Sequence, residues 1–204
     1  NSALRGWLHG LPGVDHVGCD ARAGDLGTRS IKNDAKLWAI DLAISMIDLT
    51  TLEGSDTAGK VRGLCAKALT PDASDRSTPG PAAVCVYGDM VPVAREALGT
   101  DSGVGIAAVA TAFPSGRASM AVKLADTREA VAASANEIDM VIDRGAFLAG
   151  DYLTVFHQIA DVKQACGPAR LKVIMETGEL VTYDNVRRAS WLSMLAGGDF
   201  IKTS

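Results

Sequence analysis

The stretch EIDMVIDRGAFLAGDYLTVFHQIADVKQACGPARLKVIMET, residues 137–177, predicts one complete strand–helix–strand unit. Residues 137–143 and 171–177 are short runs rich in branched apolar side chains, which favour buried strands. Between them, Asp151 can cap a helix over residues 151–166. One side of that helix carries apolar residues three or four positions apart: Tyr152, Val155, Phe156, Ile159 and Val162. Two strands joined by one covering helix are expected to be parallel neighbours in a sheet.

The same alternation extends outward from this unit over most of the chain. Apolar strand segments begin at residues 47, 82, 105, 137, 171 and 199, at intervals of 23 to 35 residues. One strand per strand–helix unit predicts an α/β fold built on a parallel sheet. Upstream of the first strand, Leu37, Ile40 and Ile44 predict a further helix over residues 36–46.

The distribution of polar residues favours one of two architectures, a closed eight-stranded barrel, over an open doubly wound sheet. In an open sheet the functional groups gather at one crevice, whereas here nearly every strand segment carries polar residues in or at the end of its apolar run. Groups that converge from many strand ends are typical of a barrel. Because only six strands are visible, we expect a (β/α)8 TIM barrel, truncated after the sixth strand. We divide the chain into an N-terminal extension (1–34) and a TIM-barrel domain (35–204).

Composition and charge argue against several other classes of protein. The chain is 48% hydrophobic and 22% charged, and its net charge of −4 disfavours nucleic acid or an anionic membrane as the main partner. No apolar run approaches the length of a membrane span. The four cysteines and three histidines are too widely spaced for a zinc site or a disulfide framework. We therefore expect reduced thiols, a cytoplasmic location and no metal.

Two lysines and one aspartate have a spacing that matches the strand–helix repeat. Lys202 follows Lys172 by 30 residues, and Asp139 precedes Lys172 by 33 residues, so the three should lie on successive strands. Asp139 alternates with Ile138 and Met140, which predicts that Asp139 points into the barrel. Amines and a carboxylate in one cavity fit imine-forming catalysis, for which a lysine pKa of about 10.4 has to fall toward neutrality. The spacing does not choose between Lys172 and Lys202, and it leaves open a purely structural Lys–Asp–Lys network.

Six segments together resemble the deoxyribose-phosphate aldolase family. They occur in the family's order and at fitting spacings from about residue 36 to the last residue: MIDLTTLEG, AAVCVY, ATAFPSG, EIDMVIDRGAFLAG, LKVIMETGEL and GGDFIKTS. The resemblance implies a (β/α)8 barrel and a class I aldolase that acts through a lysine Schiff base. The implied reaction is the reversible cleavage of 2-deoxy-D-ribose 5-phosphate to acetaldehyde and D-glyceraldehyde 3-phosphate, with no metal and no organic cofactor.

The resemblance also implies roles for individual residues. The lysine of FIKTS, Lys202, is the implied Schiff-base former, and the aspartate of EIDMV, Asp139, is implied in proton transfer. Four further residues match positions that line the family's substrate pocket: Lys172, Asp48, Thr50 and Cys85. We expect Cys85 to be a packed thiol and not a nucleophile, because no histidine is placed to activate it.

The sequence departs from the family pattern after its last residue. The family continues with Thr-Gly-Lys, a strand that carries another active-site lysine, and Gly and Ser turns that hold the phosphate, and none of these is among the 204 residues. The alternatives are an inactive barrel fragment or scaffold that needs a partner chain, and another Schiff-base sugar-phosphate aldolase. The Gly-rich extension could wrap over a neighbouring subunit, so a homo-oligomer stays open.

Overall fold

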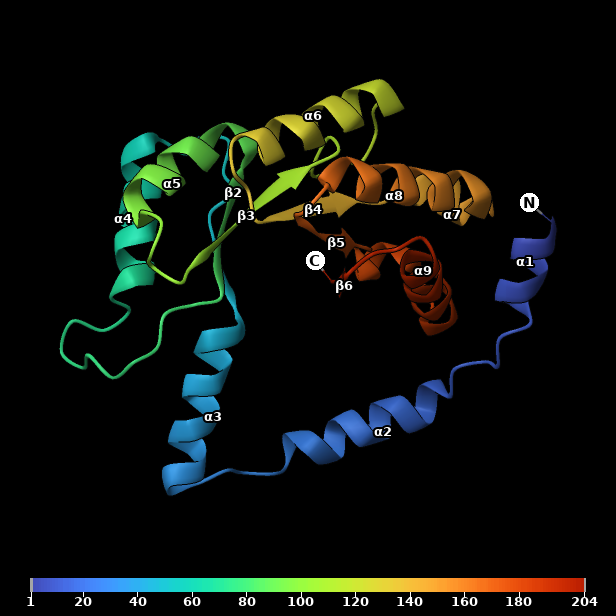
Figure 1. Cartoon of the computed structure of the whole chain (residues 1–204). Helices are drawn as coiled ribbons and strands as arrows, with labels where there is room; N and C mark the ends of the chain where they lie inside the picture. Colours follow the sequence, from blue (N-terminus) through green and yellow to red (C-terminus); the bar gives the residue numbers. More distant parts are fainter. Residues whose placement is uncertain (1, 204) are drawn as a thin grey trace.

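The computed structural model describes residues 2–203. Its strands form one six-stranded sheet, in which all neighbours are parallel and the strands pair in the order of the chain (Figure 1). The strands are β1 (Asp48–Thr50), β2 (Ala83–Tyr87), β3 (Gly105–Ala110), β4 (Glu137–Val141), β5 (Arg170–Ile174) and β6 (Phe200–Lys202). A doubly wound sheet reverses its strand order at a switch point, and this sheet keeps one direction throughout. The prediction of an α/β fold of the barrel type is confirmed.

The sheet is strongly curled, because side chains from its two edge strands meet. In a flat sheet β1 and β6 would be roughly 24 Å apart, since neighbouring strands are about 4.8 Å apart. Instead, Asp48 Oδ2 on β1 lies 3.5 Å from Lys202 Nζ on β6. The described strands therefore form a half-barrel, and its concave face gathers side chains from both edges.

Helices cover the convex face of the half-barrel (Figure 1). They are α4 (Ala58–Leu69), α5 (Val91–Leu98), α6 (Met120–Ala132), α7 (Arg144–Leu148), α8 (Tyr152–Cys166) and α9 (Tyr183–Leu195), with the 3-10 turns η1 (Gly88–Met90) and η2 (Thr177–Leu180). The Asp151 side chain caps α8, as predicted, by accepting a hydrogen bond from Thr154 N. The apolar stripe of α8 faces the sheet, and four of its predicted members are buried: Tyr152, Val155, Ile159 and Val162.

Alternation along the strands sends their side chains into two separate apolar clusters. Ile138 and Met140 point outward and pack with Leu171 and Val173 in the large cluster beneath the helices. The inward positions of β2 and β3 form a small second cluster: Ala83, Cys85, Ala107 and Val109. Asp139 is fully buried, and its contacts lie on the inward side, as its position between Ile138 and Met140 predicts.

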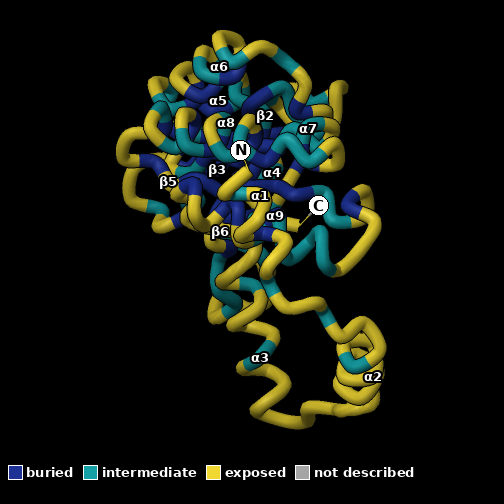
Figure 2. The backbone as a smooth tube through the Cα atoms, turned by 90° about the vertical axis from the view of Figure 1, so that its right-hand side faces the viewer, coloured by how far each residue is buried: buried dark blue, intermediate teal, exposed yellow. Residues whose placement is uncertain are grey.

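The N-terminal arm, residues 2–46, lies mostly outside this layered body and is largely exposed (Figure 2). It contains α1 (Ser2–His9), α2 (His16–Gly27) and α3 (Asn33–Met46). α1 contacts α8 and α9: Leu8 is buried there, and the Trp7 and Trp191 rings meet edge to face with centroids 5.8 Å apart.

The last arm helix, α3, has the predicted helical conformation but no covering partner within residues 2–203. None of its residues is buried, and Leu37, Trp38 and Ile40 are exposed. Among the described helices, none is long and apolar enough to cross a membrane. The predicted division of the chain after residue 34 falls within α3, and it stays a prediction.

Candidate active site

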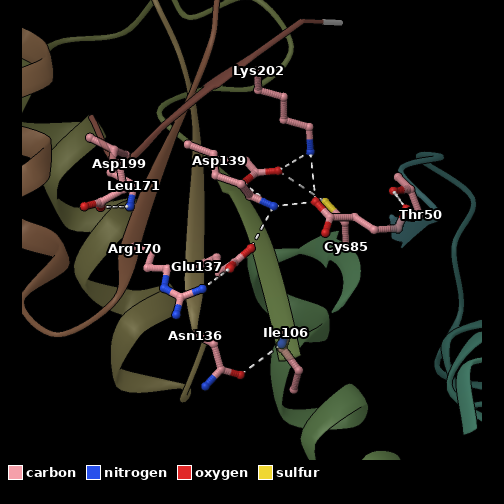
Figure 3. Close-up of polar contacts among 12 residues, drawn as sticks. Thr50, Cys85, Ile106, Asn136, Glu137, Asp139, Arg170, Leu171, Asp199 and Lys202 are labelled. Carbon is pink, nitrogen blue, oxygen red and sulfur yellow. Dashed lines mark hydrogen bonds and ion pairs between the residues drawn. The ribbon is translucent and has the colours of Figure 1, made fainter. Parts of the chain in front are cut away.

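Charged side chains from four strands converge on the concave face of the half-barrel. Asp139 on β4 and Lys172 on β5 are opposite each other in the strand register. Lys202 on β6, two strands away from β4, points toward Asp139 (Figure 3). Asp48 on β1 contacts both lysines. The convergence of Lys172, Lys202 and Asp139, predicted from their spacing, is confirmed.

Lys172 is surrounded by carboxylates at the bottom of this cluster. Its Nζ donates to Asp48 Oδ2 and lies 2.9 Å from Glu137 Oε2 and 3.2 Å from Asp139 Oδ1. Only 8% of its side chain is exposed. Burial lowers the pKa of Lys172, but the three carboxylates outweigh burial and raise the pKa above the ordinary lysine value. Lys172 is therefore held as an ammonium ion.

Lys202 occupies the accessible end of the same cluster. Its Nζ donates to Asp139 Oδ2 at 2.5 Å, and 30% of its side chain is exposed, against 0% for Asp139. Burial lowers the pKa of Lys202, but the charge of Asp139 and the hydrogen bond to it produce a net increase. The expected fall in the pKa of Lys202 is therefore wrong for this structure. The spacing of the strands does not give the distance between Asp139 and the Lys202 amine, and that contact raises the pKa.

Lys202 also lines a cavity of about 300 Å³ at the C-terminal ends of the strands. The other residues around the cavity are Thr50, Leu52, Val109, Phe113, Pro114, Ile174, Glu176 and Thr203. Lys172 is not one of the described residues that line it. Thr50 donates its hydroxyl to Asp48 O at 2.9 Å and so stands at the rim, beside β1. A ligand in this cavity would meet the Lys202 amine before any other charged nitrogen of the cluster.

Cys85 lies on the wall of the site and is chemically quiet. The side chain is fully buried, and its thiol donates to Asp139 Oδ2 over 3.6 Å. Burial and the nearby Asp139 charge raise the pKa of the Cys85 thiol to about 12. The burial confirms the prediction of a packed thiol at this position. The raised pKa disfavours the thiolate, which is the reactive form.

One member of the cluster was missed in the sequence. Glu137 contacts Lys172 through Oε2, and its other oxygen, Oε1, lies 3.6 Å from Arg170 Nη1. The signal was present, because Glu137 is two residues before Asp139 and an inward-facing strand position recurs every two residues. Within residues 2–203, no group of His, Cys, Asp and Glu side chains is arranged to hold a metal ion.

The arrangement is suited to moving protons at an amine. Asp139 is buried and accepts from Lys202 at one oxygen, while its other oxygen, Oδ1, faces Lys172 without forming a well-directed hydrogen bond. A buried carboxylate in contact with an ammonium ion is positioned to accept the proton that the amine must lose before it attacks a carbonyl carbon. The second lysine balances the carboxylate charge without blocking the cavity.

Comparison with known proteins gives a consistent result. A family model described as DeoC/LacD family aldolase matches residues 42–204. Deoxyribose-phosphate aldolase from Mus musculus is 39% identical over 201 residues, an alignment that covers 94% of this chain and 63% of the mouse protein. This chain spans 53% to 63% of the length of the curated relatives that it matches.

Solved structures support the same relationship. A crystal structure from Coccidioides immitis, of a protein assigned as a deoxyribose-phosphate aldolase, has a TM-score of 0.73 and 34% identity over 81% of this chain and 61% of that one. A deoxyribose phosphate aldolase from Aeropyrum pernix, described as a unique tetrameric structure, has a TM-score of 0.63 and 27% identity over 80% of this chain and 64% of that one. The chain belongs to the DeoC/LacD family of aldolases.

Proposed function

We propose that this protein is a deoxyribose-phosphate aldolase, which reversibly cleaves 2-deoxy-D-ribose 5-phosphate to acetaldehyde and D-glyceraldehyde 3-phosphate. The observation that carries the proposal is the Lys202 amine, which lines the cavity and donates to the fully buried Asp139. The names of the matched relatives support the choice of substrate. The matched relatives are longer than this chain, which spans 53% to 63% of their length. The activity of the complete protein is therefore part of this proposal.

We assign the nucleophile to Lys202 and not to Lys172. Lys202 has the larger exposed fraction and borders the cavity, whereas Lys172 is enclosed by Asp48, Glu137 and Asp139. An attacking amine needs both a neutral form and access to the carbonyl carbon. Lys172 has little of either, so its proposed role is to balance charge next to Asp139.

The mechanism starts with transfer of a proton from Lys202 to the Asp139 carboxylate. The neutral amine adds to the aldehyde carbon, C1, of the open-chain sugar, and loss of water leaves a protonated imine. Removal of the proton from the C3 hydroxyl lets the C2–C3 bond break, and its electron pair moves toward the imine nitrogen. Carbon C3 leaves as the aldehyde of glyceraldehyde 3-phosphate, and an enamine remains on Lys202. Protonation of the enamine carbon and hydrolysis of the imine release acetaldehyde and regenerate the amine.

Asp139 is the proposed proton shuttle, acting directly or through a water molecule or Lys172. Its two oxygens face different lysines, so Asp139 can take up a proton from Lys202 at one oxygen while the other oxygen stays beside Lys172. We propose that Asp48 and Thr50 position substrate at the rim, next to Lys202. Cys85 contributes packing.

We propose a cytoplasmic location for the protein. We also propose that the reaction uses no metal and no organic cofactor. Four free cysteines, of which Cys65, Cys85 and Cys166 are buried, suit a reducing compartment. A homo-oligomer is also proposed, on the strength of the tetrameric relative and the uncovered apolar residues of α3. Light scattering tests it: a mass equal to one chain would overturn it.

The experiment that tests the proposed function is borohydride trapping with acetaldehyde, followed by intact mass and peptide mapping. We expect a two-carbon adduct on the peptide that contains Lys202, and none on the peptide that contains Lys172. The variant Lys163→Met is a matched control, because Lys163 pairs with Asp199 on the outer side, away from the cavity. Absence of an adduct would support the inactive scaffold. Trapping by a ketone donor, but not by acetaldehyde, would support a different Schiff-base aldolase.

A further inference from the structure

Arg144 lies at the rim of the half-barrel, where no role follows from the sequence motifs. The Asp143 side chain caps α7 by accepting a hydrogen bond from Ala146 N at 2.9 Å, so that Arg144 is the first residue of the helix after β4. Only 16% of the Arg144 side chain is exposed. A guanidinium group so enclosed at a barrel mouth needs specific partners.

The partners of Arg144 come from two different loops. On one side, Nη2 donates to Ser115 O at 3.2 Å and to Pro114 O at 3.4 Å, in the loop after β3. On the other side, Nε lies 3.1 Å from Glu179 Oε2 and Nη1 lies 3.5 Å from Glu176 Oε2, in the loop after β5. The planar fork of arginine can hold several acceptors at once in fixed directions. Arg144 therefore links the loops that follow β3 and β5.

Both loops supply walls of the Lys202 cavity. Phe113 and Pro114 line it from the loop after β3, and Glu176 lines it from the loop after β5. Arg144 is thus in contact with two residues of the cavity wall, Pro114 and Glu176, without itself lining the cavity.

The backbone of both loops is strained near the residues that Arg144 contacts. Thr111 and Ala112 have φ of 63° and 61°, and Glu176 has φ of 52°. Side-chain-bearing residues adopt this left-handed region at a cost, and they stay there only when surrounding contacts hold them. In the first loop, Thr111 also exchanges hydrogen bonds with Val141, and Ala112 N donates to Asp126. Arg144 contacts both loops, so loss of its contacts should loosen both walls together.

We propose that Arg144 is a positioning residue that fixes the width of the cavity around Lys202 and so sets how well a large aldehyde is bound relative to acetaldehyde. Acetaldehyde, with two carbons, needs only contact with the Lys202 amine in order to be trapped. A five-carbon sugar phosphate must also be aligned by the walls. This inference rests on the proposed function for its substrates, but the link between the loops does not.

The test compares Arg144→Met with the wild type in two measurements on the full chain. The first is the concentration of each aldehyde that gives half-maximal borohydride trapping on Lys202. For 2-deoxy-D-ribose 5-phosphate we expect an increase of about ten- to a hundredfold, because small displacements of positioning groups have effects of this size. For acetaldehyde we expect a change of less than about twofold, since the Lys202–Asp139 contact is untouched. Arg144→Lys should restore part of the loss, because one ammonium can pair with Glu176 or Glu179 but cannot hold both loops.

The second measurement is amide hydrogen exchange, which needs no substrate. We expect segments 111–116 and 176–181 to exchange faster together in Arg144→Met. The control Arg62→Met, which removes an exposed ion pair between Arg62 on α4 and Glu96 on α5, should change neither segment. Unchanged exchange in both loops, or equal loss of trapping for both aldehydes, would overturn the proposal. A wild-type protein that traps no aldehyde would overturn the proposed function alone, and the exchange data would still decide whether Arg144 links the loops.

Discussion

The two faces of the sheet differ in chemistry although they are made by the same strands. On β4, Ile138 and Met140 face outward and are sealed beneath the helices, while Asp139 between them faces two lysines. The outward side chains stabilise the fold through burial of apolar area. The inward charges offer little stability, because the desolvation of buried ions offsets their attraction. The outer face therefore holds the structure and the inner face carries the chemistry, and single substitutions should separate the two.

The largest expected effect is on the inner face, from Lys202→Met. Trapping with acetaldehyde should fall more than about a thousandfold, because no other amine of residues 2–203 lines the cavity. The free energy of unfolding should change by less than about 2 kcal/mol, since Asp139 keeps Lys172 as a partner. Trapping at wild-type rate in this variant would mean that another lysine is the nucleophile.

The outer-face counterpart is Ile138→Ala. Ile138 is fully buried, so its truncation should cost about 2 to 5 kcal/mol of unfolding free energy. Urea denaturation measures this cost, and the trapping rate per folded molecule should stay at the wild-type value. A large loss of trapping in the folded fraction would show that the two faces are not separable.

A smaller effect, on pH dependence, is expected from Asp139→Asn. In the wild type the Asp139 charge raises the pKa of Lys202, so the neutral amine fraction and the trapping rate should grow as pH rises toward that raised value. With a neutral amide at position 139, burial and the Lys172 ammonium should lower the pKa of Lys202, and the rise in trapping should move to lower pH. The maximal rate should also fall, because the proton acceptor is lost. A rise that stays at the same pH would exclude Asp139 as the group that controls the amine.

The smallest effect is expected outside the sheet, from Ile40→Ala on α3. In a single chain the side chain is exposed, so the unfolding free energy of the monomer should change by no more than about 0.5 kcal/mol. Ile40→Ala removes the same atoms as Ile138→Ala, but from a helix with no buried residue. A cost above about 2 kcal/mol would indicate that another surface covers α3 in solution.

The sequence was sufficient for the elements that depend on local periodicity. Every predicted strand is present, and so is each helix predicted between two strands, because alternation and the three-to-four spacing are set by the geometry of strand and helix. The ends were less predictable. The apolar run 171–177 predicted a longer strand, but β5 ends at Ile174 and Glu176 already lies in the left-handed region. Likewise, α7 was not predicted, because a helix of five residues is too short to show an apolar stripe.

The strand positions of the site residues could be predicted from the strand–helix repeat. The distances between their side chains could not. The spacing brought Asp139, Lys172 and Lys202 to successive strands. The pKa direction of Lys202 required the distance to Asp139, which no spacing supplies. The loops held by Arg144 adopt conformations that few local signals predict, because they are fixed by contacts between residues about 30 positions apart. For α3, periodicity predicts the helix but says nothing about what covers it.

The pairing of β5 with β6 has a consequence for how this family can vary. Lys202 is opposite Ile174 and not opposite Lys172, so the amine stands two residues nearer the mouth than the Asp139–Lys172 pair. A deletion of one residue inside β6 would turn the amine to the outer face. Length variation among relatives is therefore expected to accumulate in the turns and to be purged from three residues, Phe200–Lys202.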